Sequence, residues 1–292
     1  MSRDTTYGRA TVRQLCAAFK ISRQAYYQAL STPAVEASGP RPEREGPWAT
    51  AAELEAKVRE CAEAHPAWGV RKVHAHLRRR KVVASRKRVW AVMKRLGLVL
   101  PAPEHREEGA RLGTVAVPES NRRWATDLTT VWTRQDGLVA VVPVIDCGDR
   151  TVLDFEVTSS QESPAVLAPL ARALEEQFGR PQDVPDGLEL RSDHGPQYTG
   201  GDCSQLIAQW RLDHTFAPVG RPTGNAVAER FILTMKSELI WTRDWDTAAE
   251  LRDALRCWLE VYHHERPHQA LGWKTPAEKR AENLKQNLTM AA

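Results

Sequence analysis

Leu188-Glu-Leu-Arg-Ser-Asp193-His-Gly opens the stretch of sequence that decides the fold, and Asn225-Ala-Val-Ala-Glu229-Arg-Phe closes it. The apolar alternation before Asp193 predicts a short strand, which puts this aspartate at a strand end. Glu229 follows after 35 intervening residues, in a run with helical spacing. This arrangement can bring both carboxylates to one metal site.

A third carboxylate comes from the upstream run Arg123-Trp-Ala-Thr-Asp127-Leu-Thr-Thr-Val-Trp, whose Thr, Val and Trp content predicts a strand. Mg²⁺ and Mn²⁺ prefer hard oxygen ligands, and two such ions about 4 Å apart can promote phosphodiester cleavage. We therefore expect Asp127 and Asp193 to bridge one ion, and Asp127 and Glu229 to hold the other.

Two further residues lie on the same side of the predicted helix as Glu229. Lys236 follows seven positions later, which is two helical turns, and its ammonium could hold the DNA strand that is cut. Asn225 precedes Glu229 by four positions. A single carboxylate in such a run would more often be a surface residue or a helix cap, but three acids in strand, strand and helix contexts favour the metal site.

The charge of the chain is unevenly distributed. Residues 1–120 contain 22 Lys and Arg against 12 Asp and Glu, whereas residues 121–292 contain 19 against 25. A basic first part and an acidic second part indicate polyanion binding by the first, and metal binding or another task for the second. The hydrophobic content of 42% is that of an ordinary globular protein.

Neither a membrane protein nor a disulfide-stabilised one is indicated. The longest apolar run, residues 138–145, is far shorter than the ~20 residues needed to cross a bilayer, and the first residues contain no apolar signal core. The five cysteines are scattered, without a Cys-x-x-Cys pair. We therefore expect a cytoplasmic protein.

The N-terminal part, residues 1–35, predicts a helix-turn-helix. Apolar residues recur at helical spacing on both sides of a break, and Ser22 is a favourable N-cap for the second helix. That helix would present Arg23 and Gln24 to a DNA major groove; the alternative is a helical hairpin that packs on another part of the protein. Residues 36–50, rich in Pro, Gly and Glu, predict a linker.

Residues 51–100 form the most basic part of the chain and predict a second helix-turn-helix-like domain, in which Ser85 caps one helix and Gly97 ends it. No acidic residue occurs between positions 65 and 103, whereas a solvated helix face would mix both signs. We therefore expect contacts to the DNA backbone from Arg71, Lys72, Arg78, Arg79, Arg80, Arg86, Lys87 and Arg88.

The sequence also predicts whether three other side chains of this domain are buried or exposed. Trp90 is predicted to belong to the apolar core with the valines and leucines of the two helices. His74 and His76 are expected at the helix surface rather than at a metal, because no cysteine or second histidine pair accompanies them.

Residues 101–120 predict a linker, residues 121–243 an α/β catalytic core, and residues 244–292 an amphipathic helix and tail. Turn-rich joints indicate an antiparallel set of three strands, over residues 123–134, 137–145 and 151–157. Helices and strands then alternate, which predicts a mixed sheet, over residues 163–178, 188–192, 202–210, 214–217 and from Asn225 onward.

Several residues near the predicted site have weaker assignments. Tyr198 either contacts the end of the DNA or packs in its loop. Arg266 is expected to be structural. Five other acids are interpreted as turn or surface residues, because nothing in their surroundings favours catalysis: Asp146, Asp149, Asp154, Glu156 and Glu189.

The segments Trp124-Ala-Thr-Asp127-Leu-Thr, Ser192-Asp193-His-Gly and Asn225-Ala-Val-Ala-Glu229-Arg-Phe, with Lys236, resemble the Asp, Asp, 35-spaced Glu signature of DDE transposases with a retroviral-integrase-like core. Tyr262-His-His-Glu-Arg-Pro-His-Gln-Ala-Leu-Gly-Trp-Lys-Thr-Pro resembles the stretch that commonly follows that core in bacterial insertion sequences. The B-frame product of two-frame elements shows the strongest resemblance, over nearly the whole chain.

This resemblance implies a ribonuclease H-like core with Mg²⁺ or Mn²⁺, two ions expected, held by Asp127, Asp193 and Glu229. It implies binding of terminal inverted repeats and target DNA, 3′-end cleavage and strand transfer, by a homo-oligomer on paired ends. An upstream-frame product or fusion partner is also implied. The sequence before Asn225 departs from the family's usual Tyr-Asp-Asn form, which leaves the subfamily open.

Two alternatives to a transposase remain at this point. A ribonuclease H-like nuclease would hydrolyse DNA without joining ends. A non-catalytic regulator would use its helix-turn-helix parts to bind DNA while the core stays idle, although the intact acids argue against it.

Overall fold

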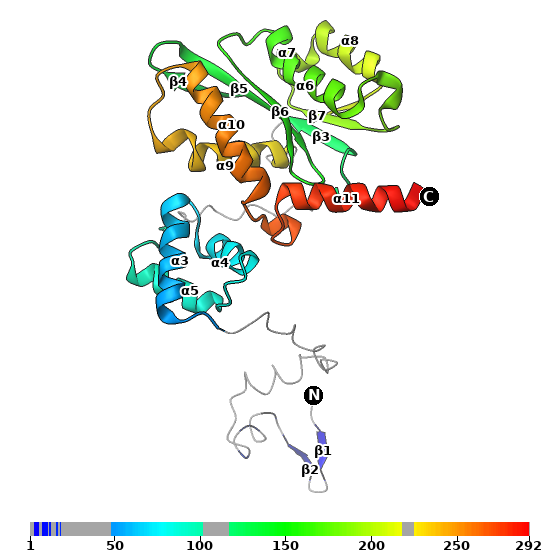
Figure 1. Ribbon diagram of the computed structural model, residues 1–292. Coiled ribbons are helices and arrows are strands. Elements are labelled where there is room, and N and C mark those ends of the chain that lie inside the picture. The colour runs from blue at the N-terminus through cyan, green and yellow to red at the C-terminus, as the bar shows by residue number, and fades with distance from the viewer. Residues whose placement is uncertain are drawn as a thin grey trace. The chain divides into compact units, whose positions relative to one another are not determined.

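The computed structural model describes residues 3–5, 8–10, 12, 16, 18, 48–101, 117–217 and 225–291. The chain forms two compact units, Met1–Pro47 and Trp48–Ala292 (Figure 1). In the first unit, β1 (Arg3–Thr5) pairs antiparallel with β2 (Gly8–Ala10). The second helix predicted within residues 1–35, with Arg23 and Gln24, lies outside the described residues.

Three helices form a small module at the start of the second unit: α3 (Ala51–Ala64), α4 (Val70–Arg79) and α5 (Arg86–Arg95). As predicted, the Ser85 hydroxyl caps α5 by accepting a hydrogen bond from the backbone N–H of Arg88, and Gly97 follows with a φ of 69°. The helices bury a common apolar cluster made of Leu54, Val58, Cys61, Trp68, Val73, Leu77, Val89, Val92 and Met93.

Two side chains of this helical module differ from the expectation. Trp90 is 46% exposed instead of buried, because it lies outside the arc of α5 that Val92 and Met93 occupy. His76 is buried instead of lying at the surface, because Trp68 covers it with ring centroids 5.4 Å apart.

A mixed sheet of six strands forms the centre of the remaining part of this unit. The central strand is β5 (Gly137–Asp146). On one edge it pairs antiparallel with β6. On the other edge its first half pairs antiparallel with β4 and its second half with β3. β3, β7 and β8 run parallel, so the order is β6-β5-β3-β7-β8, and within the described residues β4 pairs only with β5. The other strands are β3 (Arg123–Thr126), β4 (Thr129–Thr133), β6 (Val152–Thr158), β7 (Glu189–Ser192) and β8 (Asp213–Phe216).

The predicted strand over residues 123–134 is interrupted, which corrects the sequence-based expectation. It divides into β3 and β4 on either side of Asp127 and Leu128. The Asp127 carboxylate accepts a hydrogen bond from the N–H of Leu128 at 2.8 Å, and such a local bond competes with regular strand pairing. Asp127 therefore lies at the end of a strand and not within one.

Helices cover both faces of the sheet (Figure 1). On β5, Val139 and Val141 face α9 (Ala226–Glu238) and α10 (Ala248–His264), whereas Ala140 and Val142 face α6 (Ser163–Phe178) and α8 (Gly201–Trp210). This alternation is the period of a strand buried on both sides. Short α7 (Pro196–Thr199) follows β7, and α11 (Pro276–Ala291) follows α10. Single 3-10 turns occupy Pro181–Asp183, Ile240–Thr242 and Gln269–Leu271.

No helix in the described part of the chain is long and apolar enough to cross a membrane.

Two acids that were expected to be turn or surface residues are completely buried: Asp146 at the end of β5, and Asp149 in the turn that follows it. The guanidinium of Arg280, from α11, donates to them at 3.3 and 2.9 Å. The hydroxyl of Ser120 donates to Asp149 at 2.6 Å. These acids are therefore structural, and burial is possible because each is paired.

Gly148 lies in this turn, close to the backbone of the segment before β3. This close approach predicts how an added methyl group at Gly148 would change the stability of the protein. A Cβ at Gly148 would collide with the backbone carbonyl of Glu119, which cannot move without distorting that segment. We expect Gly148→Ala to lower the free energy of unfolding by roughly 1–3 kcal/mol, measured by urea denaturation. Gly201→Ala is the control, because open space surrounds its Cβ; an equal loss in both variants would contradict this prediction.

Candidate active site

One hydrogen bond ties the start of α9 to the end of β3. Asn225, which precedes α9, is buried, and its side-chain amide donates to the carbonyl oxygen of Thr126 at 2.8 Å. Asp127 directly follows Thr126. Glu229 lies one turn into α9, where its N–H donates to the Asn225 carbonyl at 3.0 Å. The segments that carry Asp127 and Glu229 are therefore held together, although they are far apart in the sequence.

The neighbouring parallel strand positions Asp193. In the register of β3 and β7, Ala125 is opposite Arg191, and Asp127 and Asp193 each follow two residues later. The exposed Asp193 carboxylate accepts a hydrogen bond from the N–H of Gly195 at 2.9 Å. A Cβ on Gly195 would lie 3.0 Å from that carboxylate, so glycine leaves the acid room.

The charges of Asp193, Glu229 and Lys236 act on the carboxyl group of Asp127. Burial raises the pKa of Asp127 to about 6; the Leu128 N–H opposes this, while the negative charges of Asp193 and Glu229 add to it and Lys236 lowers it. Burial also raises the pKa of Glu229. The register of β3 and β7 and the hydrogen bond from Asn225 to Thr126 relate the segments that carry the three acids.

The chemistry of this donor set suits a hard divalent cation. Among the described residues, no ion pair at contact distance joins these acids to a basic side chain, and no three ligands are already arranged around one point as in a formed metal site. The carboxylates are therefore oxygen ligands whose mutual repulsion a cation would relieve. Carboxylate oxygens are ligands of the type that Mg²⁺ and Mn²⁺ prefer, but within the described residues these three are not gathered around one point.

Tyr198, which was considered for contact with the DNA end, is buried. Its hydroxyl and that of Thr126 form a hydrogen bond at 3.2 Å. The packing alternative is therefore correct for Tyr198, because an aromatic ring in this position fills the space beneath α7 and α8. Sequence alone gave no signal that Tyr198 and Asn225 both contact Thr126, the residue before Asp127: Tyr198 bonds to its hydroxyl and Asn225 to its carbonyl.

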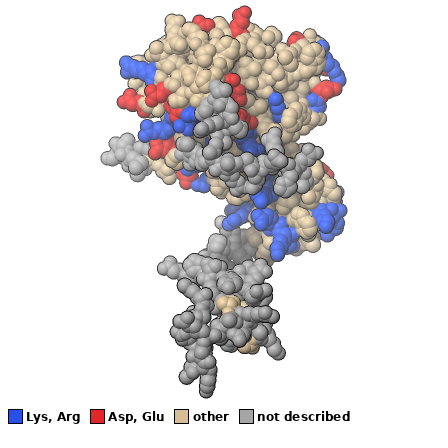
Figure 2. Space-filling model, turned by 180° about the vertical axis from the view of Figure 1, so that it is seen from behind, with Lys and Arg blue, Asp and Glu red and all other residues tan. Residues whose placement is uncertain are grey.

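The eight basic residues expected to contact DNA fall into two groups. Figure 2 shows Lys and Arg side chains gathered over the helical module. Arg88 donates to the Ala49 carbonyl at 2.7 Å, and three others pair with acids far along the chain: Lys72 with Glu238, Arg79 with Glu278 and Arg80 with Glu265. No ion pair within the described residues involves Arg71, Arg78, Arg86 or Lys87.

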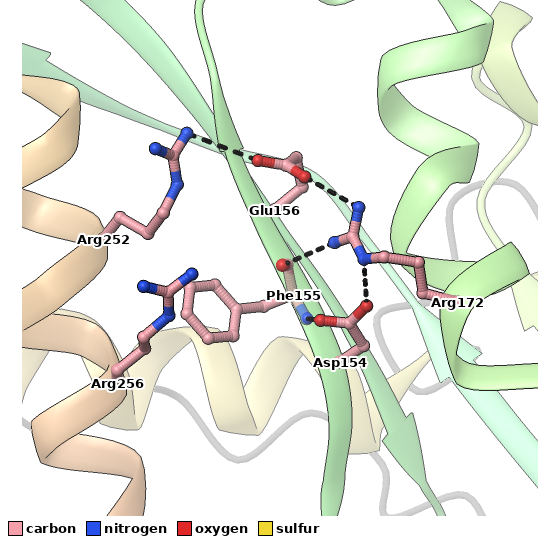
Figure 3. Close-up of a pocket in the computed structure, with 6 residues that line it drawn as sticks. All are labelled: Asp154, Phe155, Glu156, Arg172, Arg252 and Arg256. Carbon is pink, nitrogen blue, oxygen red and sulfur yellow. Dashed lines mark hydrogen bonds and ion pairs between the residues drawn. The ribbon is translucent and has the colours of Figure 1, made fainter. Parts of the chain in front are cut away.

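A separate pocket of about 300 Å³ lies between β6, α6 and α10 (Figure 3). Arg172 donates to Asp154 at 2.6 Å and to Glu156 at 3.0 Å, and Arg252 also donates to Glu156, at 3.4 Å. Phe155 and Arg256 complete its lining. Because the basic groups are largely neutralised inside the pocket and the candidate acids do not line it, we interpret it as structural.

Comparison with protein families defines the class of this chain. Models of the integrase core domain match residues 117–222 and 202–276, and a model of an HTH-like domain matches residues 49–106. With the observed strand order, these matches define a ribonuclease H-like integrase core, the fold of a polynucleotidyl transferase, preceded by a helix-turn-helix-like region.

Two relatives establish the family. "Transposase InsD for insertion element IS2A/D/F/H/I/K" from Escherichia coli is 33% identical over 229 residues, which cover 73% of this chain and 73% of that protein. "Transposase InsD for insertion element IS2D" from Escherichia coli (strain K12) matches with the same identity and coverage. This chain belongs to the insertion-element transposases of this type, as the sequence motifs indicated.

Solved structures that resemble this chain include two retroviral integrase core domains. The catalytic core domain of BIV integrase has a TM-score of 0.43 and 20% identity, over 57% of this chain and 99% of that one. The HTLV-2 integrase catalytic core domain in complex with magnesium has a TM-score of 0.41 and 14% identity, over 55% of this chain and 96% of that one.

The raised pKa of Asp127 predicts a pH dependence of stability. The folded chain holds this proton up to about pH 6, whereas an unfolded aspartate loses it near pH 4. Stability therefore falls as the pH rises between these values, and the cost persists above them. We expect Asp127→Asn to raise the free energy of unfolding by on the order of 2 kcal/mol at pH 8 with a chelator present, and to change little below pH 4.

Urea denaturation at the two pH values measures this effect. Asp202→Asn is the matched control, because Asp202 is an exposed aspartate in the first turn of α8. The electrostatic interpretation would be wrong if Asp127→Asn were not stabilised at pH 8. It would also be wrong if the control were stabilised as much as Asp127→Asn.

Proposed function

We propose that this chain cuts the 3′ ends of its insertion element and joins them to target DNA, with Asp127, Asp193 and Glu229 as the ligands of two divalent ions. The observations that support the proposal are the register of β3 and β7 and the hydrogen bond from Asn225 to Thr126, which relate the chain segments of the three acids. The charges of Asp193 and Glu229 also raise the pKa of Asp127. The integrase-core matches over residues 117–276 support it.

The reaction consists of two displacements at phosphorus. In cleavage, a water oxygen forms the new P–O bond, and the 3′ oxygen of the element strand leaves and is protonated. In joining, this 3′-hydroxyl attacks a target phosphodiester, and the target's own 3′ oxygen leaves. Divalent ions, when bound, activate the attacking oxygen and stabilise the leaving oxygen.

The protein's own groups hold the reactants of both steps. Above its raised pKa, the Asp127 carboxylate is ionised and would hold the ions together with Asp193 and Glu229. Lys236 contacts a phosphate oxygen of the strand that is cut, because it lies on the same helix as Glu229 and its charge reaches Asp127.

Replacement of one acid tests this assignment. We expect Asp193→Asn to reduce Mg²⁺-dependent 3′-end cleavage by at least roughly 10²–10³-fold, because the amide removes a charged ligand but keeps the size of the side chain. Binding to the element ends should be retained. Cleavage of labelled end DNA and gel-shift binding measure the two properties.

Asp202→Asn serves again as the control and should cleave like the unsubstituted chain. Cleavage by Asp193→Asn at the same rate as the control would reject the proposed site. If ends are cut but never joined to target DNA, the chain is a hydrolysing nuclease, and if ends are bound but never cut, it is a regulator.

We further propose that the exposed side of α5 meets the DNA. Arg86 and Lys87 have no ion-pair partner among the described residues, and Trp90 is exposed between Lys87 and Lys94, whose ammonium lies 5.1 Å from the centre of its ring. Cations bind the phosphates, and an exposed aromatic ring can contact sugars or bases. The terminal inverted repeats of the element are the expected DNA partner, bound by a homo-oligomer on paired ends. An upstream-frame product or fusion is a further expected partner.

The salt dependence of binding tests this surface. Each phosphate contact contributes about 0.9 to the slope of log K against log salt, so Lys87→Met should reduce the slope by about that amount. Arg79→Met should leave it unchanged, because Arg79 pairs with Glu278. Equal slopes for Lys87→Met and the unsubstituted chain would exclude Lys87 from the interface.

A further inference from the structure

Helix α9 ends in a buried ionic junction centred on Glu238. The side chains of Glu238 and Arg266 are 6% and 8% exposed, and Arg266 donates to Glu238 Oε1 from Nε at 3.1 Å and from Nη2 at 2.9 Å. Two donors come from the helical module: Lys72 Nζ at 2.6 Å and Trp68 Nε1 at 3.2 Å. One carboxylate thus joins the module, α9 and the segment after α10.

This junction differs from the other ion pairs of the module. Burial alone would raise the pKa of Glu238, but the donors, with Arg266 first, lower it below the usual value. Removal of one partner from a buried pair leaves a charge without compensation. Arg80 and Glu265 are instead about half exposed, and such surface pairs contribute little. Glu238 is therefore the principal polar contact of the module with the rest of its unit.

Apolar and polar contacts surround the junction. Val261 of α10 packs against the buried cluster of the helical module, and Arg79 of α4 pairs with Glu278 of α11. The ion pairs of the module with α9 and α11 come from Lys72 and Arg79 of α4. Arg86, Lys87 and Trp90 of α5 take no part in these contacts. The face proposed for DNA therefore stays available while the module is docked.

We propose that Glu238 is a positioning residue that docks the helical module onto α9, so that Lys72 serves this docking and not the DNA backbone. Glu229 lies nine positions earlier on the same helix, about 13 Å along its axis. The docked module would then present bound DNA to Asp127, Asp193 and Glu229 in one orientation. The statement about cleavage rests on the proposed function, whereas the statement about docking does not.

A distance measurement between two spin labels on the full chain tests the docking directly. Cys257 is exposed, whereas the other four cysteines are buried, and the exposed Ala91 of α5 can be changed to cysteine for the second label. We expect one narrow distance distribution by pulsed electron paramagnetic resonance. Lys72→Met and, separately, Glu238→Gln should broaden it, and Lys87→Met, a lysine outside the junction, should not.

The salt slope of DNA binding distinguishes docking from phosphate contact at Lys72. Docking predicts that Lys72→Met keeps the slope of the unsubstituted chain, whereas Lys87→Met lowers it by about 0.9. A drop in Lys72→Met equal to that in Lys87→Met would assign Lys72 to the DNA. Distributions that stay narrow in both Lys72→Met and Glu238→Gln would also overturn the proposal.

The position of the cut gives a readout that loss of stability alone would not change. With the module undocked, we expect cleavage at least tenfold slower and spread over neighbouring phosphodiesters, with end affinity retained. Slow cleavage at the normal position would indicate a structural role only and would reject positioning by Glu238. If the unsubstituted chain does not cleave, the proposed function fails, while the label distances still decide the docking.

Discussion

The site depends on the hydrogen bond that the Asn225 amide donates to the Thr126 carbonyl, because this bond fixes a helix against the end of a strand. Its consequence is that acids of like charge are held near each other. Their repulsion is a cost that the apolar contacts of α9 offset, since Phe231, Ile232 and Met235 are buried against the sheet and α10. The fold thus maintains a concentration of negative charge that would otherwise disperse.

Much of the fold could be predicted from periodicity, because burial of one or both faces constrains the side chains of each element. The bounds expected for α6 agree with the structure, and those for β8 differ by one residue at each end. Helix α9 begins one residue after the expected start at Asn225. The division of β3 from β4 could not be predicted this way. It results from the Asp127 carboxylate bonding to its neighbour's N–H, which leaves no trace in the alternation of apolar residues.

The candidate acids could be found from their type and spacing, but the contacts of the basic residues could not. An unbroken run of positive charge indicates an anionic partner, yet it does not reveal whether that partner is DNA or a carboxylate of the same chain. Lys72 meets Glu238 across 166 positions, and no local pattern encodes such a pairing. The burial of Tyr198 and His76 could not be predicted from the local sequence either, because it depends on residues that pack against them in the folded chain.

The contact of Arg280 with Asp146 and Asp149 joins residues that the ribosome makes at very different times. Arg280 follows Asp146 by 134 positions, so the ribosome makes both carboxylates long before the guanidinium that pairs with them. Until then, the turn between β5 and β6 cannot be enclosed without an uncompensated charge. A shortened polypeptide that lacks α11 would lose this guanidinium, and we expect it to leave the turn open to water and to proteases.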